Sequence, residues 1–212
     1  MEFKKSFYLI GLGIFILILA GLWACSGGGG NTASSGGTGT TGGPGTGGAN
    51  GTLTVNLTDT PFTDAKAVLV TFSEVQAHHS GSGWVKVNFA GGNTITSRTC
   101  DLKRLDGAQD VLGSDSLPSG HYTQIRLVVT ESTLYFDNST SDPVCAPSIS
   151  APAGNSGPLE ISSGEIKLNR EFDLAAGGGT SILLDFDADK SIHQTSKDHY
   201  RMNPVISIVS VQ

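Results

Sequence analysis

An alternating run of aspartates is the first feature of this sequence that could do chemistry. Asp185, Asp187 and Asp189 occupy every second position of the segment Asp-Phe-Asp-Ala-Asp. On an extended backbone the three carboxylates lie on one face, where they repel one another. A hard cation such as Ca²⁺ would relieve that repulsion through oxygen ligands. Asp59 and Asp64, which follow an earlier expected strand, could add further oxygens.

Two other interpretations of these aspartates stay open. The run does not match an EF-hand loop, because Lys190 stands where that loop has glycine and Ser196 where it has glutamate. The carboxylates could instead cap backbone N–H groups at a strand end, which is the interpretation we favour. A pair of them could also serve a hydrolase, since glycoside hydrolysis uses two carboxylates.

Histidines and nucleophiles do not form a recognisable catalytic pattern. His78 and His79 are adjacent, so on a strand they point to opposite faces and cannot chelate one ion without a bend. We expect them, like His121, His193 and His199, to be surface side chains. The sequence has no G-x-S-x-G elbow and no glycine-rich loop that follows a strand and opens a helix. We therefore predict no catalytic residues and no cofactor apart from the calcium alternative.

Three further side chains invite a structural and a functional interpretation. Arg126 lies between Ile125 and Leu127, so strand alternation places it on the opposite face. We expect it to pair with a carboxylate across the sheet. Trp84 and Tyr122 could line a sugar-binding surface, but we favour a place at the edge of the core.

Composition excludes several classes of protein. The chain has 212 residues and a formal net charge of −6, with a pI of about 5.2. No basic surface is expected that could neutralise phosphates, so we expect no nucleic-acid partner. The 29 glycines have no triplet period, which excludes a collagen-like chain.

The first 51 residues have the layout of an anchor and a spacer. Residues 1–25 combine Lys4 and Lys5 with a long apolar run, as in a signal peptide. Their end, Leu-Trp-Ala-Cys25, resembles a bacterial lipobox, in which the cysteine is lipidated and becomes the new N-terminus. An uncleaved anchor helix is the alternative. Residues 26–51 contain 13 glycines among 26 residues and no charge, so we expect a flexible linker.

This layout predicts that the protein is located in the cell envelope. By resemblance to lipoprotein sorting in Gram-negative bacteria, Ser26 rather than aspartate after the lipidated cysteine favours the outer membrane. With Cys25 lipidated, Cys100 and Cys145 remain as one candidate disulfide pair, which an oxidising compartment would favour. Such a bridge would add roughly 3–4 kcal/mol of stability on the chain-entropy model. Two buried free thiols are the alternative.

Residues 52–212 read as one folded domain built from strands. Alternating apolar residues over 52–58 place Leu53, Val55 and Leu57 on one face. In the strand 66–78 the apolar parity changes, which predicts a bulge near Ser73-Glu74. The other expected strands cover 84–89, 122–130 with an extension to 136, 165–174, 181–187 and 204–211.

The connections complete the expected architecture. We expect one short helix over 101–109, a long loop over 137–164 and a hairpin connection over 175–180. Seven or eight strands without a long amphipathic helix predict an all-β fold, with two antiparallel sheets packed as an Ig-like or transthyretin-like β-sandwich.

Four segments resemble a known bacterial family. They are Leu53-Thr-Val-Asn-Leu-Thr-Asp59, Gly120-His-Tyr-Thr-Gln-Ile-Arg-Leu127, Leu184-Asp-Phe-Asp-Ala-Asp-Lys-Ser191 and Asn203-Pro-Val-Ile206. They look like the lipoprotein family catalogued as domain of unknown function 4382, and the resemblance covers nearly all of 51–212. It implies an envelope-attached β-sandwich related to carboxypeptidase-regulatory, transthyretin-like modules. It implies no reaction and no catalytic residue.

The functional hypothesis follows from these features together. We expect a membrane-anchored envelope lipoprotein that carries a non-catalytic binding or structural module. Its partners would be the membrane, through the lipid on Cys25, and a surface protein or extracellular polymer. The alternatives are a calcium-stabilised adhesion or polymer-binding module and an envelope hydrolase that uses Asp185, Asp187 and Asp189.

Overall fold

The computed structural model describes residues 49–212. The predicted signal peptide 1–25, its lipidation site Cys25 and residues 26–48 of the predicted linker lie outside the described residues. In chain order the elements are β1 (Asn50–Thr60), β2 (Ala67–His79), β3 (Gly83–Lys86), β4 (Arg98–Asp101), the 3₁₀ helix η1 (Leu102–Leu105), β5 (Asp110–Pro118), β6 (Gly120–Tyr135), β7 (Cys145–Ala146), β8 (Ser156–Ile161), β9 (Glu165–Leu174), β10 (Gly179–Asp187), α1 (Ala188–Ser191), β11 (Ile192–Ser196), β12 (His199–Met202) and β13 (Ile206–Val211).

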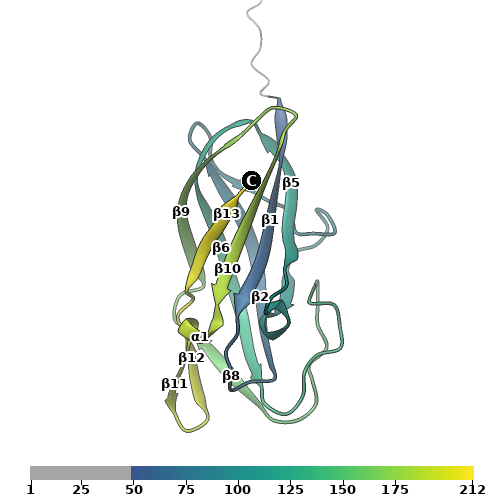
Figure 1. The fold of residues 1–212 in the computed structure, drawn as a ribbon, viewed down its shortest axis with the longest axis vertical. Coiled ribbons are helices and arrows are strands. Elements are labelled where there is room, and N and C mark those ends of the chain that lie inside the picture. Colours follow the sequence, from purple (N-terminus) through teal and green to yellow (C-terminus); the bar gives the residue numbers. More distant parts are fainter. Residues whose placement is uncertain (1–48) are drawn as a thin grey trace, which may run out of the picture. The chain divides into compact units, whose positions relative to one another are not determined.

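These strands form two sheets, which confirms the predicted all-β sandwich. The small sheet has the order β13-β10-β1-β5, and the large sheet has the order β11-β12-β8-β6-β2-β4-β7. In the large sheet β3 also pairs with β2, and β9 pairs with β6. Figure 1 shows the small sheet lying over β9, β6 and β2 of the large one. Among the described residues no helix is long and apolar enough to span a membrane.

Two details of the predicted architecture were wrong. Residues 49–212 contain thirteen strands rather than seven or eight. The sheets are also mixed rather than purely antiparallel, because β1 runs parallel to β10 and β12 runs parallel to β8. The parallel pairing of β1 with β10 joins strands far apart in the sequence, and alternation within each strand does not reveal its partner.

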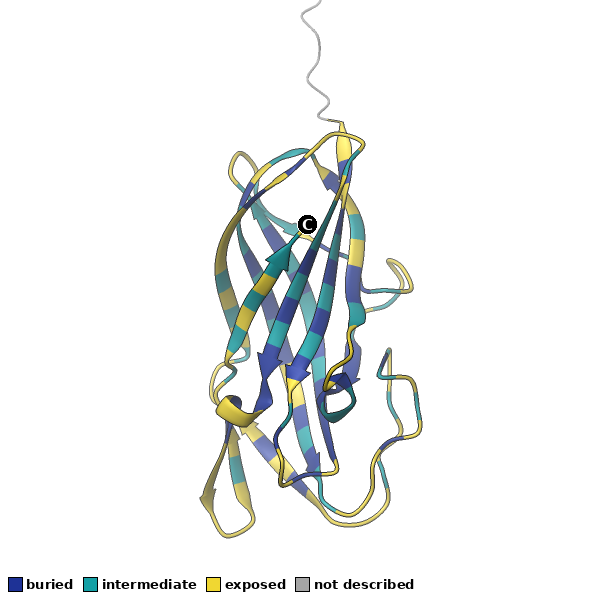
Figure 2. Cartoon of the chain, in the orientation of Figure 1, coloured by how far each residue is buried: buried dark blue, intermediate teal, exposed yellow. Residues whose placement is uncertain are grey.

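The core follows the predicted alternation most closely in β1. Leu53, Val55 and Leu57 are fully buried, and the two residues between them, Thr54 and Asn56, are partly exposed. Figure 2 shows the same alternation of buried and open positions along β1 and β10. The inward-facing residues of both sheets thus form one continuous apolar core.

The longest pairing in the molecule is between β2 and β6, and it carries the bulges. The register shifts between Phe72 and Glu74, which confirms the bulge expected near Ser73-Glu74. A second shift leaves Thr130 as the extra residue of β6 between Val129 and Glu131. Bulges of this kind redirect the side chains that follow them.

The structure also contains elements that the sequence analysis missed. β4 and β5 were not expected, and the segment 137–164 contains β7 and β8 as well as loop. The predicted helix over 101–109 is only the 3₁₀ turn Leu102–Leu105, whose two leucines are buried. The segment 175–180 does not close a hairpin, since β9 pairs with β6 and β10 pairs with β1. It carries the chain from one sheet to the other.

The expected disulfide is present. Cys100 and Cys145 are bonded at a sequence separation of 45, and the bond joins β4 to β7 at a paired position of the large sheet. This bond holds the start of the loop that follows β7 against the sheet.

Candidate functional site

Asp59, predicted as an additional calcium ligand, is buried at the end of β1. It pairs in register with Phe186 of β10, and both side chains face the interior. One carboxylate oxygen accepts a hydrogen bond from the backbone N–H of Ala188 at 3.1 Å, and the other has no partner among the described residues. Burial raises the pKa of Asp59 to about 8, and the nearby carboxylates of Asp185 and Asp187 add to the rise. The Asp59 carboxyl group is therefore favoured in its protonated, neutral form at pH values below about 8.

Asp187 has the capping role that we favoured. Its side chain accepts hydrogen bonds from the backbone N–H of Lys190 at 2.9 Å and from the Lys190 ammonium at 2.6 Å. These contacts close the single turn of α1, and the hydrogen bond from the Lys190 side chain is the main cause that lowers the pKa of Asp187.

The other two aspartates do not complete a cation site with these. Asp185 lies at an outward position of β10 between the buried Leu184 and Phe186, and Asp189 is exposed on α1. Within residues 49–212 no group of three or more His, Cys, Asp and Glu side chains is arranged to hold a metal ion. Alternation explains this, because Asp59 points inward while Asp185 points outward.

The adjacent histidines lie on different sides of β2 and hold local structure. His78 forms a hydrogen bond with Thr123 at 2.9 Å and packs edge-on against Trp84. The His79 ring packs against the buried ring of Tyr122, and its Nδ1 accepts hydrogen bonds from the backbone of the β2–β3 turn. These contacts give both side chains structural partners.

Trp84 lies on the outer face of the large sheet, so its predicted place at the edge of the core was wrong. The guanidinium of Arg126 stacks on its ring at 4.4 Å from the centroid. Arg126 also donates to Gln76 at 2.8 Å and lies 3.7 Å from Glu165, the carboxylate partner expected across the sheet. Tyr122 is buried in the core as predicted, and its hydroxyl donates to the carbonyl of Pro118.

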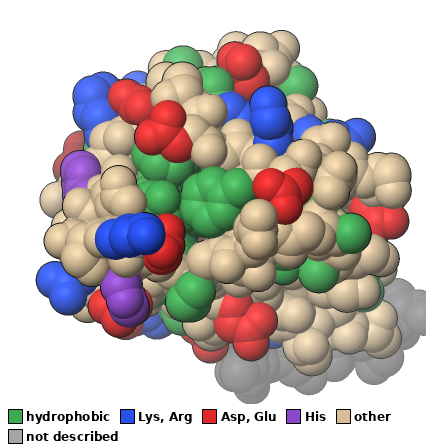
Figure 3. Space-filling model, turned by 90° about the horizontal axis from the view of Figure 1, so that it is seen from below, with side chains coloured by type: hydrophobic (Ala, Val, Ile, Leu, Met, Phe, Trp, Pro, Cys, Tyr) green, Lys and Arg blue, Asp and Glu red, His purple; other side chains and the backbone are tan. Residues whose placement is uncertain are grey.

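The lower end of the sandwich mixes apolar and charged groups. Figure 3 shows apolar side chains gathered near the centre of this end, with acidic, basic and histidine side chains around them. In this region the ring centroids of Phe136 and Tyr200 lie 5.6 Å apart. Phe136 and Pro158 also line a hollow of about 280 Å³.

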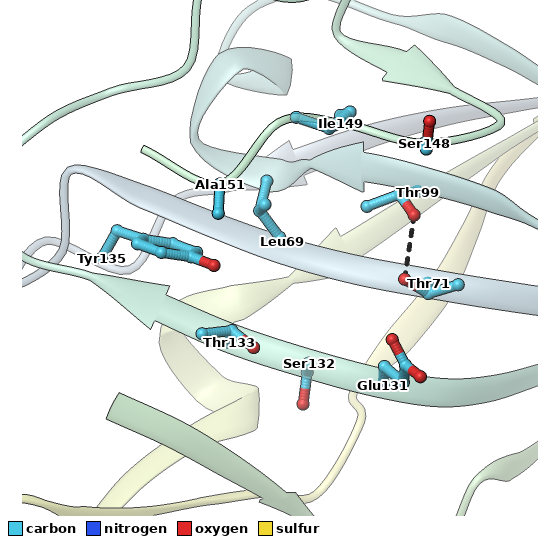
Figure 4. Close-up of a pocket in the computed structure, with 10 residues that line it drawn as sticks. All are labelled: Leu69, Thr71, Thr99, Glu131, Ser132, Thr133, Tyr135, Ser148, Ile149 and Ala151. Atoms are coloured by element: carbon cyan, nitrogen blue, oxygen red, sulfur yellow. Dashed lines mark hydrogen bonds between the residues drawn. The ribbon is translucent and has the colours of Figure 1, made fainter. Parts of the chain in front are cut away.

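A more polar hollow, which the sequence analysis did not find, lies on the outer face of the large sheet. Its volume is about 250 Å³, and the residues that line it come from β2, β4, β6 and the loop after β7: Leu69, Thr71, Thr99, Glu131, Ser132, Thr133, Tyr135, Ser148, Ile149 and Ala151. Figure 4 shows the strand residues below and the loop residues above this space. The loop thus forms a wall over a floor of strands.

Several polar side chains of this hollow have no side-chain partner within residues 49–212. The hydroxyl groups of Thr71 and Thr99 form a hydrogen bond with each other at 2.9 Å, and the Ser132 hydroxyl donates a hydrogen bond to the backbone carbonyl of Leu159. Four other polar side chains of the lining have neither a side-chain hydrogen bond nor an ion pair to residues 49–212: Glu131, Thr133, Tyr135 and Ser148. A second hollow of about 430 Å³ shares Glu131, Ser132 and Thr133 with the first.

Comparison with known proteins identifies a family and no activity. A family model described as "Domain of unknown function (DUF4382)" matches residues 50–204. No curated protein matches the chain. Among solved structures, the chain is similar to a leucine-rich repeat protein from Bacteroides thetaiotaomicron, at 18% identity and a TM-score of 0.21. That match covers 67% of this chain and 14% of the other, so the chain spans a small part of that protein. Because the TM-score is this low, we draw no conclusion about fold or function from the similarity.

Proposed function

Because the chain belongs to the family described as a domain of unknown function (DUF4382), which names no activity, we propose a function from the chain's own residues. The protein is a lipid-anchored component of the cell envelope, and its β-sandwich is a non-catalytic binding module. The unpaired polar side chains of the hollow on the large sheet are the observation that carries the binding role.

The anchoring half of the proposal is supported by the N-terminal sequence. Leu-Trp-Ala-Cys25 follows a long apolar run, and the glycine-rich residues 26–51 provide a spacer between Cys25 and the sandwich. The disulfide between Cys100 and Cys145 agrees with an oxidising compartment outside the cytoplasm. Ser26, rather than aspartate, agrees with transfer to the outer membrane.

The binding half is supported by the chemistry of the hollow. The side chains of Glu131, Thr133, Tyr135 and Ser148 line one hollow and have no side-chain hydrogen bond or ion pair within residues 49–212. Glu131 and Ser148 are solvent-exposed, and Thr133 and Tyr135 are half-buried, so a ligand can reach all four polar groups. The hollow contains a single carboxylate, that of Glu131, whereas glycoside hydrolysis uses two. Recognition therefore fits this arrangement better than hydrolysis.

Metabolic labelling with an alkyne analogue of palmitate tests the anchor. Cells that express the full chain should incorporate the label, and the variant Cys25→Ala should not. The double variant Cys100→Ala/Cys145→Ala is the matched control and should label like the wild type. An unlabelled wild-type protein would refute the anchor. The variant Ser26→Asp should keep the label and move to the inner-membrane fraction.

Photo-cross-linking in intact cells tests the binding module. A photoreactive amino acid placed at Thr133 should yield a cross-linked envelope component, whereas the same group at Gln124 should not. Gln124 is a suitable control because it lies on the same strand and its amide already donates to Asn169 at 2.7 Å. Equal cross-linking at both positions, or none at either, would argue against a binding site in the hollow.

A further inference from the structure

We propose that the hollow on the outer face of the large sheet binds neutral sugar units of an extracellular polysaccharide. This inference deepens the proposed function and rests on it. Its basis is a half-open hollow in which hydroxyl and carboxylate groups, without a side-chain partner among residues 49–212, meet apolar side chains.

The free groups have the chemistry that a sugar requires. The hydroxyls of Thr133, Tyr135 and Ser148 can each donate and accept, and the Glu131 carboxylate accepts. A sugar presents neighbouring hydroxyls that do the same. The lining contains no lysine, arginine or histidine, so nothing in it would neutralise an anionic ligand.

The apolar part of the lining suits the other surface of a sugar ring. Leu69, Ile149 and Ala151 contribute aliphatic contacts, and the ring of Tyr135 lies at the same opening in Figure 4. A space of about 250 Å³ is at the small end of ligand pockets, which agrees with a single sugar unit rather than a large cofactor.

The remainder of the outer face shows the contrast. Nearer the β2–β3 turn the polar side chains of this face pair with one another: Arg126 with Gln76, Gln124 with Asn169 and Lys167 with Glu165. That part of the face is internally satisfied, and a ligand would have to break existing contacts. In the hollow a ligand would meet groups that are free.

The loop wall is held in place before any ligand arrives. The disulfide fixes Cys145 at its start. Farther along, the Ser150 N–H donates to Asp142 at 2.5 Å, Asn138 donates to the carbonyl of Ala153 at 2.7 Å, and the Asn155 N–H donates to Asp137 at 2.6 Å. A wall that is already ordered lowers the entropy cost of binding.

The second hollow suggests room for more than one sugar unit. It shares Glu131, Ser132 and Thr133 with the first and is completed by Thr130, Leu159 and Ile161. The bulge at Thr130 separates this stretch of β6 from the part paired with β9. A polysaccharide could therefore contact β6 at adjoining positions.

Affinity electrophoresis of the full-length protein, in a detergent without a sugar headgroup, tests the proposal. Native gels would contain dextran, laminarin, xylan or galactomannan as neutral probes, with alginate and glycol chitosan as anionic and cationic ones. We expect at least one neutral polysaccharide to retard the protein. The variants Thr133→Val, Tyr135→Phe and Glu131→Gln should each weaken retardation about 2- to 10-fold, as expected for loss of one hydrogen bond.

A control variant and the possible outcomes of the electrophoresis determine whether the saccharide proposal holds. Gln124→Ala should bind like the wild type, and thermal melts should show that every variant folds. Normal migration in all neutral gels, equal retardation of all variants, or retardation by glycol chitosan alone would overturn the saccharide proposal. If cross-linking at Thr133 still captures a protein in cells, the binding module stands and only its saccharide ligand fails.

Discussion

At the scale of single residues, Asp59 shows how position changes the role of a carboxylate. Sequence spacing grouped it with Asp185, Asp187 and Asp189 as an oxygen ligand. In the fold its side chain is buried at the end of β1. One carboxylate oxygen accepts a hydrogen bond from the backbone N–H of Ala188, and the other has no partner among the described residues. Burial favours its neutral form, so its pKa rises to about 8.

This shift predicts a pH-dependent stability with a defined sign. The unfolded chain binds the Asp59 proton with a pKa of 3.8, and the folded chain binds it with a pKa of about 8. Between these values the folded state holds more proton, so the free energy of unfolding falls as pH rises from about 4 to about 8. The loss is up to about 6 kcal/mol in total.

The variant Asp59→Asn isolates this contribution. Urea unfolding at pH 5 and pH 8 should show a larger decrease in stability for the wild type than for the variant, because asparagine does not titrate. The neighbours Asp185, Asp187 and Lys103 remain in both proteins, so the comparison removes the titration of Asp59 together with its coupling to their charges. Parallel stability profiles for the two proteins would contradict the prediction.

At the scale of elements, β5 explains why one strand escaped detection. Its sequence contains Gly113, four polar residues (Asp and Ser) and a terminal proline, which are weak strand formers. Gly113 is nevertheless required, since a Cβ at this position would lie 2.8 Å from the carbonyl oxygen of Asn88. The close approach of the two backbones therefore requires glycine at this position. Because glycine has a low strand propensity, the sequence analysis did not predict the strand.

A glycine pair tests this account of β5. Gly113→Ala should lower the free energy of unfolding by about 1–3 kcal/mol, because the added methyl group overpacks a backbone contact. Gly179→Ala in β10 is the matched control, since the nearest atom to its Cβ would be 4.0 Å away. Thermal or urea unfolding would measure both, and equal losses in the two variants would contradict the explanation.

The bond between β4 and β7 is a second element with a measurable effect. The Cys100–Cys145 bridge closes a long segment and should contribute about 4 kcal/mol on the chain-entropy model. Reduction, or the double variant Cys100→Ala/Cys145→Ala, should lower the melting temperature and loosen the wall that holds Ser148 and Ile149. Melting with and without a reducing agent checks the first effect. A reductant-insensitive wild type would contradict it.

At the scale of the whole molecule, the calcium hypothesis can be tested against the observed arrangement. Asp185 and Asp187 lie near enough to Asp59 to raise its pKa, but the capping of α1 by Asp187 and the inward position of Asp59 keep the carboxylates from meeting as a cation site within residues 49–212. We therefore expect the same melting midpoint in excess Ca²⁺ and in EDTA, because only a ligand bound by the native state raises stability. A higher midpoint with Ca²⁺ would restore the calcium-stabilised alternative.

The whole fold also separates what local pattern can and cannot show. The alternation of Leu53, Val55 and Leu57 predicted both a strand and its buried face, because side chains on a strand alternate with period two whatever its neighbours are. The same property predicted the ion pair across the sheet from Arg126. The parallel partner of β1 lies more than a hundred residues away, and no local signal names it.

The sequence by itself determined the all-β class, the main core strands and the candidate disulfide, since these depend on periodicity and on counting cysteines. Only the tertiary structure decided the strand pairing, the separation of the aspartates and the place of Trp84. It also brought Thr133 and Tyr135 of β6 together with Ser148 of the loop after β7. Such groups meet because strand register and loop path are set by packing across the whole chain, which the spacing of residues along the chain does not encode.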